Sequence, residues 1–94
     1  MTIDRHQKAR HDLASTMAAL APEVGPWTAM FSPSHNEWLI VAAAPYPGNA
    51  NHAIVRLGYW QVRSLLDGVF GPVAHDVVVE ELKKQLAEQG KNND

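Results

Sequence analysis

Residues 27–43, WTAMFSPSHNEWLIVAA, decide the fold predicted for this chain. In residues 27–32, Trp27, Ala29 and Phe31 fall on one face and the residues between them fall on the other, as in a strand. Residues 33–36 have the composition of a turn, because proline presets φ while serine and asparagine side chains bond to the nearby backbone. Residues 38–43 are apolar on both faces, which predicts a central strand with both sides covered. The stretch therefore predicts a β-hairpin.

The two sides of that central strand follow from its alternation. Leu39 and Val41 are expected to be buried on one face, and Trp38 and Ile40 to be largely covered on the other. Residues 45–51, PYPGNAN, have the composition of a loop. Residues 52–57, HAIVRL, alternate again and predict a third strand. The three strands together predict an antiparallel meander.

The segments before and after the predicted meander have apolar residues at the spacing of a helix. Apolar residues at positions 9, 13, 17 and 20 form one stripe of a helix that starts at Thr2 or Asp4 and ends at Leu20. Residues 59–67 predict a short helix that stops at Gly68. Apolar residues at positions 74, 78, 82 and 86 predict a last helix over residues 72–90. Three consecutive valines at 77–79 favour a strand, but the charged residues that follow them favour the helix.

These segments predict one α+β domain over residues 1–90 and a polar C-terminal tail over residues 91–94. A chain of 94 residues has room for a single hydrophobic core. The expected fold has two layers, in which a three-stranded antiparallel meander packs with an N-terminal helix and two C-terminal helices. The helices are expected to stack on one face of the sheet.

Composition excludes several classes of function. Eight Lys and Arg against ten Asp and Glu give a net charge of −2, so a nucleic-acid partner is not expected. The absence of cysteine excludes disulfides, thiolate metal sites and thiol nucleophiles. The first ten residues are polar, unlike a signal peptide, and no apolar run approaches the ~18 residues of a membrane span. We therefore expect a cytoplasmic protein with no membrane partner.

The histidines lack the spacing that metal binding needs. They are His6, His11, His35, His52 and His75. His6 and His11 are five residues apart on the predicted helix and point in different directions, whereas two ligands on one face need i,i+3 or i,i+4 spacing. Scattered surface histidines are the simpler interpretation, and we expect no metal and no cofactor.

A hydrolase triad is not expected either. Ser32, Ser34, His35 and Glu37 contain its ingredients, but they lie around one turn, where their side chains are expected to diverge. No G-x-S-x-G elbow is present to activate a serine. The sequence therefore predicts no catalytic residue, and the protein is expected not to be an enzyme.

The aromatic residues are the main candidates for partner binding. Most of the seven should fill the core, but they cannot all fit inside so small a domain. Tyr46, between two prolines, and either Trp27 or Trp60, at element boundaries, are expected to be exposed as contact residues. Arg56 and Arg63 join them, because aromatic residues and arginine dominate interface hot spots. The loop over residues 45–51, with Tyr46 as its anchor, is the expected centre of the surface.

The best-supported class of function is a small non-enzymatic protein-interaction module that binds another protein. Such chains are typical of bacterial phage and mobile-element accessory proteins, including anti-CRISPR-like and antitoxin-like inhibitors; a homodimer is also compatible. The alternatives are a secretion-type chaperone, or a small enzyme or ligand-binding domain with a pocket between helices and sheet that uses His35, His52 or Arg56. An interaction protein should expose an aromatic patch, whereas an enzyme should have a concave pocket into which histidine, arginine or carboxylates converge.

Overall fold

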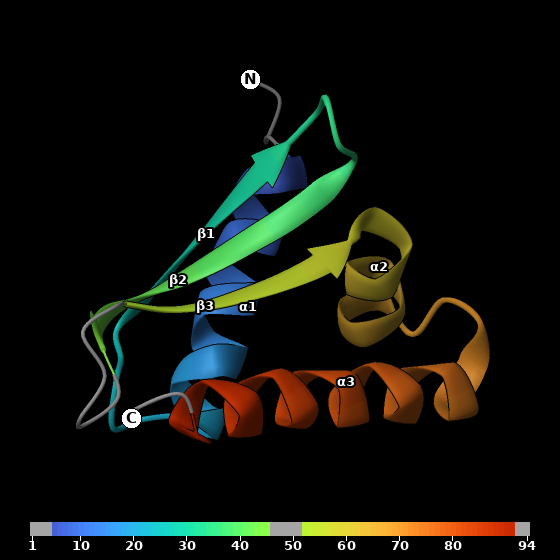
Figure 1. The fold of residues 1–94 in the computed structure, drawn as a ribbon. Helices are drawn as coiled ribbons and strands as arrows, with labels where there is room; N and C mark the ends of the chain where they lie inside the picture. The colour runs from blue at the N-terminus through green and yellow to red at the C-terminus, as the bar shows by residue number, and fades with distance from the viewer. Residues whose placement is uncertain (1–4, 46–51, 92–94) are drawn as a thin grey trace.

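The computed structural model describes residues 5–45 and 52–91, which Figure 1 shows as a ribbon. Its elements follow in the order α1 (Arg5–Leu20), β1 (Trp27–Ser32), β2 (Glu37–Pro45), β3 (His52–Gly58), α2 (Tyr59–Asp67) and α3 (Gly71–Lys91). The strands form one antiparallel sheet in the order β1-β2-β3. The predicted α+β class, the meander and the order of helices around it are confirmed.

The element bounds differ from the prediction at a few positions. β2 runs from Glu37 to Pro45 and is longer than the predicted 38–43, because Glu37 pairs with Ser32 on one side and Gly58 on the other. α3 extends to Lys91, the first residue of the predicted tail. Residues 1–4 and 92–94 lie outside the described residues. The division into a domain over 1–90 and a tail over 91–94 stays a prediction.

One face of the sheet carries the core. Trp38, Ile40 and Ala42 of β2 are buried on this face, and Figure 1 shows α1 behind the sheet. The helices contribute the other large buried side chains, which are Leu13, Met17, Val62, Val78 and Leu82. Burying a side chain of this size is worth roughly 1.5–3 kcal/mol, so this layer is the main source of stability.

The opposite face of the sheet is open, which corrects the expectation that residues 38–43 are covered on both sides. Leu39 and Val41 are only half-buried there, whereas Trp38 and Ile40 are fully buried. Beside them on the same face, Met30 is 49% exposed. The reason is the placement of the helices: α1 and α2 pack on the core face, and α3 runs along the edge of β3 (Figure 1).

Two glutamine side chains of α3 close the edge of β3. The Arg56 N–H donates to Gln85 Oε1 at 2.9 Å, and Gln85 Nε2 donates to the Arg56 carbonyl at 2.8 Å. Gln89 makes the same two kinds of bond with the backbone of Ile54. The spacings match, because residues i and i+4 of a helix are about 6 Å apart along its axis and residues i and i+2 of a strand about 6.8 Å. α3 is thus fixed in register against the sheet.

The connection between α2 and α3 has an unusual backbone. Gly68 ends α2 in the left-handed conformation with φ +71°, as predicted for a glycine stop. Phe70 follows with φ +76° and Gly71 with φ +86°. A left-handed φ costs an L-residue such as phenylalanine roughly 1–2 kcal/mol. The chain therefore turns a sharp corner here, with an aromatic residue at a position that suits glycine.

Within residues 5–45 and 52–91, no helix combines the length and the hydrophobicity of a membrane span.

Candidate functional site

An exposed apolar surface lies where α2 and α3 meet, and we call it the corner patch. It consists of Trp60, Phe70, Val73 and Val77, whose exposed fractions are 55%, 68%, 77% and 62%. The rings of Trp60 and Phe70 lie edge to face, with centroids 6.0 Å apart. Large apolar side chains that gather on a surface in this way are typical of interaction sites.

A shallow groove of about 320 Å³ runs through the corner patch between α2 and α3. Trp60, Phe70 and Val77 line it, and so does Ser64, which is 2% exposed. The Ser64 hydroxyl is buried without a hydrogen-bond partner in the described part of the chain. A buried polar group in that state costs stability.

Charges border the corner patch on both sides. On α2, the Arg63 guanidinium lies 6.0 Å from the centroid of the Trp60 ring, within the range of a cation–π contact. On α3, Asp76 and Glu80 follow Val73 and Val77 at helical spacing, with side chains 80% and 75% exposed. The border along α3 is therefore acidic and well hydrated.

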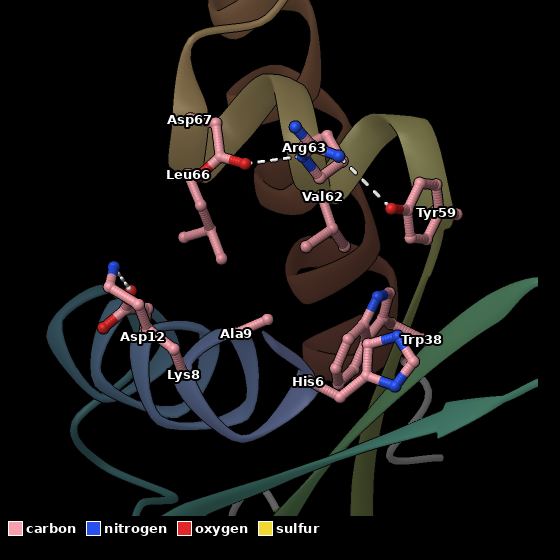
Figure 2. Close-up of a pocket in the computed structure, with 10 residues that line it drawn as sticks. All are labelled: His6, Lys8, Ala9, Asp12, Trp38, Tyr59, Val62, Arg63, Leu66 and Asp67. Carbon is pink, nitrogen blue, oxygen red and sulfur yellow. Dashed lines mark hydrogen bonds and ion pairs between the residues drawn. The ribbon is translucent and has the colours of Figure 1, made fainter. Parts of the chain in front are cut away.

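A second candidate site is a cavity of about 520 Å³ between α1 and α2, drawn in Figure 2. Its apolar lining comes from Ala9, Trp38, Val62 and Leu66, and its polar lining from His6, Lys8, Asp12, Tyr59, Arg63 and Asp67. The His6 ring lies at one end, with its centroid 5.7 Å from that of Trp38. The cavity is thus apolar inside and charged at its mouth.

Each helix carries one ion pair at the mouth of this cavity. On α1, Lys8 Nζ lies 2.9 Å from Asp12 Oδ2, and on α2 Arg63 Nε lies 2.5 Å from Asp67 Oδ2. The hydrogen bond and charge of Asp12 raise the pKa of Lys8, and the charge of Asp67 on the opposite helix raises it further. Hydrogen bonds to Tyr59 and Asp67 likewise raise the pKa of Arg63. The two pairs therefore interact across the cavity.

Comparison with known proteins identifies no relative of this chain. Nothing matches this chain among protein-family models, curated proteins or solved structures.

The structure separates the residues predicted to bind a partner. Trp60 is exposed in the corner patch and Arg63 lies beside it. Trp27 is a core residue with 4% exposure, and its indole N–H donates to the Ala21 carbonyl at 3.4 Å, so Trp60 is the exposed member of that predicted pair. Arg56 lies on the open face of the sheet, at the edge closed by α3. The prediction for Tyr46 and its loop falls outside the described residues.

The histidines remain apart, but the turn after β1 differs from the prediction. Its side chains converge instead of diverging: Ser32 Oγ and Ser34 Oγ each lie 3.1 Å from His35 Nδ1. Both hydroxyls compete for the same nitrogen on an exposed turn, so the cluster satisfies itself as a local polar network. Within the described part of the chain, no three histidine or acidic side chains gather as metal ligands.

Sequence reasoning missed most of both sites. Phe70 is one of the seven aromatic residues, most of which are expected to fill the core, and Val73 and Val77 lie outside the predicted apolar positions 74, 78, 82 and 86 of the last helix. The expected pocket residues His35, His52 and Arg56 do not line the cavity. Its lining includes His6 and Arg63 instead. Two signals for the corner patch are present in the sequence: the position of Trp60 at an element boundary, and the number of valines over residues 73–79, since a helix that packs on one side needs fewer apolar residues.

Proposed function

We propose that this chain is a small non-enzymatic protein-interaction module that binds its partner through the corner patch. The observation that carries the proposal is the gathering of Trp60, Phe70, Val73 and Val77, all more than half exposed, on one corner of so small a domain. The partner is another protein, and the module acts in the cytoplasm as an accessory or inhibitory factor of the phage or mobile-element type.

The backbone at Phe70 supports this proposal. The left-handed backbone conformation of Phe70 costs conformational energy, and because the side chain is 68% exposed, its burial offsets little of that cost. Residues held in sparsely populated conformations cluster at functional sites, where the strain is part of the design. Presenting the Phe70 ring next to Trp60 is the evident use of that conformation.

Charge complementarity defines the chemistry of the partner. Asp76 and Glu80 border the patch along α3, and the C-terminal part of the chain from residue 67 carries six acids against three lysines. The partner segment should therefore present apolar side chains toward the patch and basic side chains toward α3.

Selection from a displayed library of random peptides tests the proposal directly. We expect enriched peptides that combine two or three large apolar residues with flanking lysine or arginine. Their binding should fall at least tenfold for Trp60→Ser, as for a hot-spot residue. The matched control is Met30→Ser, which makes an apolar-to-polar change at a 49% exposed position on the open sheet face.

Two results would overturn the proposal. One is a selection in which no peptide is enriched more strongly on the parent protein than on a double variant that carries Trp60→Ser and Phe70→Asn. The other is enriched peptides that lose binding to Met30→Ser and keep binding to Trp60→Ser, which would move the contact to the sheet.

A further inference from the structure

We propose that the cavity between α1 and α2 is a binding site for a free α-amino acid with a large apolar side chain. This inference goes beyond the proposed function, because the lining of the cavity includes none of the four residues of the corner patch and the cavity takes a different class of ligand.

The interior of the cavity suits an apolar side chain. Figure 2 shows Val62 and Leu66 pointing from α2 toward α1, where Ala9 faces them, with Trp38 at one end. Ala9 leaves room that a larger residue at this position would fill. A volume of about 520 Å³ lies within the ~300–1,000 Å³ of ordinary small-molecule sites. The space between the helices can therefore hold an aromatic or branched aliphatic group.

The mouth of the cavity selects the head group. Lys8 and Asp12 on one helix, with Arg63 and Asp67 on the other, place two positive and two negative groups around the opening. A ligand with a single charge meets both attraction and repulsion there. A zwitterion can turn its carboxylate toward the cations and its ammonium toward Asp12 or Asp67, so it gains from both signs.

Arg63 has N–H donors that remain available for a ligand carboxylate. Its described bonds are from Nε to Asp67 and from Nη1 to the Tyr59 hydroxyl at 3.2 Å. A guanidinium has five N–H donors, and in the described part of the chain Nη2 donates to no group. Because Tyr59 and Asp67 hold the guanidinium in place, it is oriented before a ligand arrives. An α-amino acid joins the carboxylate, the ammonium and the apolar group at one carbon, as this arrangement requires.

The three tryptophans allow a direct test by NMR, because their indole N–H signals report three different places. Trp38 lines the cavity, Trp60 lies in the corner patch and Trp27 lies in the core. On titration with L-phenylalanine we expect shifts of the Trp38 signal with a Kd on the order of 1 mM, the affinity typical of a ligand this small. 2-Phenylethylamine and 3-phenylpropionate, which keep the ring but carry one charge each, should bind at least fivefold more weakly.

Two variants place the ligand in the cavity. Asp67→Asn should weaken L-phenylalanine about tenfold, as expected for a lost contact with a charged group. Ala9→Phe should fill the cavity and abolish the Trp38 shifts. Glu88→Gln is the matched control, since it neutralises an exposed acid of α3 that does not line the cavity, and it should bind like the parent protein.

The proposal is overturned if L-phenylalanine causes no shift at millimolar concentration, or if the singly charged analogues bind as well as the zwitterion. It is also overturned if the shifts appear at Trp60 and not at Trp38. These results leave the proposed protein contact at the corner patch untouched, so the two proposals fail separately.

Discussion

Replacing Phe70 with asparagine should remove a contact residue without destabilising the fold. Phe70 is 68% exposed, so about a third of its surface is buried. Full burial of a phenylalanine side chain is worth ~1.5–3 kcal/mol, and the buried third therefore contributes about 0.5–1 kcal/mol. The left-handed φ of +76° costs roughly 1–2 kcal/mol, and asparagine relieves part of this cost because it tolerates that conformation.

The two contributions nearly cancel for Phe70→Asn. We expect the free energy of unfolding to stay the same or to rise by up to about 1 kcal/mol, which for a domain of this size raises Tm by no more than ~4–8 °C. Equilibrium unfolding in urea, followed by circular dichroism, gives the free energy. The comparison variant is Phe31→Asn, which removes a partly buried aromatic residue from β1 without relieving any left-handed backbone. That variant should lose more than about 2 kcal/mol.

Peptide binding to Phe70→Asn should fall although the stability of this variant does not. Selected peptides that recognise the corner patch should bind Phe70→Asn at least tenfold more weakly, although the variant is fully folded. The reasoning is refuted if Phe70→Asn loses more than about 1 kcal/mol of stability, because Phe70 would then be a packing residue whose burial outweighs its strain.

Other predictions concern stability and can be checked by the same urea titration. Ser64→Ala removes a buried hydroxyl that has no hydrogen-bond partner among residues 5–45 and 52–91, and it should stabilise the protein by about 1 kcal/mol; a loss of stability would mean that the hydroxyl is hydrogen-bonded in solution. Gln85→Glu should lower the free energy of unfolding by about 1–3 kcal/mol at neutral pH, because a carboxylate cannot donate a hydrogen bond to the Arg56 carbonyl. Acidification that protonates the new side chain should restore part of the loss. An unchanged stability would argue against this contact. Ile40→Ala should cost about 2–5 kcal/mol and Leu39→Ala only about 1 kcal/mol, since only the first side chain is fully buried; equal losses would mean that the sheet is covered on both sides.

Most of the fold could be predicted from the sequence, because the periodicity of each element is local. The alternation in residues 27–32 and 52–57 identifies two strands, and Gly68 identifies the end of α2. The open face of the sheet could not be predicted in the same way. An apolar run such as residues 38–43 has the same pattern whether one face or both are covered, and the difference depends on where the helices pack.

The candidate sites depend still more on tertiary structure. The cavity exists because α1 and α2 lie on the same face of the sheet without packing tightly along their whole length, although 38 residues separate Leu20 from Tyr59 in the chain. The corner patch depends on the left-handed backbone of Phe70, and a phenylalanine between Val69 and Gly71 gives no sign of that conformation. Trp60 was predictable as an exposed aromatic residue at an element boundary, but the valines beside it had the pattern of a core stripe.

The paired glutamines of α3 also affect how the protein behaves when it is crowded. An unprotected strand edge recruits further strands, and polymerisation along the sheet is the usual hazard for a chain that also exposes apolar side chains. Gln85 and Gln89 occupy the N–H and C=O groups of Arg56 and Ile54 that an incoming strand would need. The same helix that exposes Val73 and Val77 in the corner patch therefore blocks growth of the sheet at β3. The proposed contact surface and the protected strand edge are therefore different surfaces, and a high protein concentration does not start strand pairing at that edge.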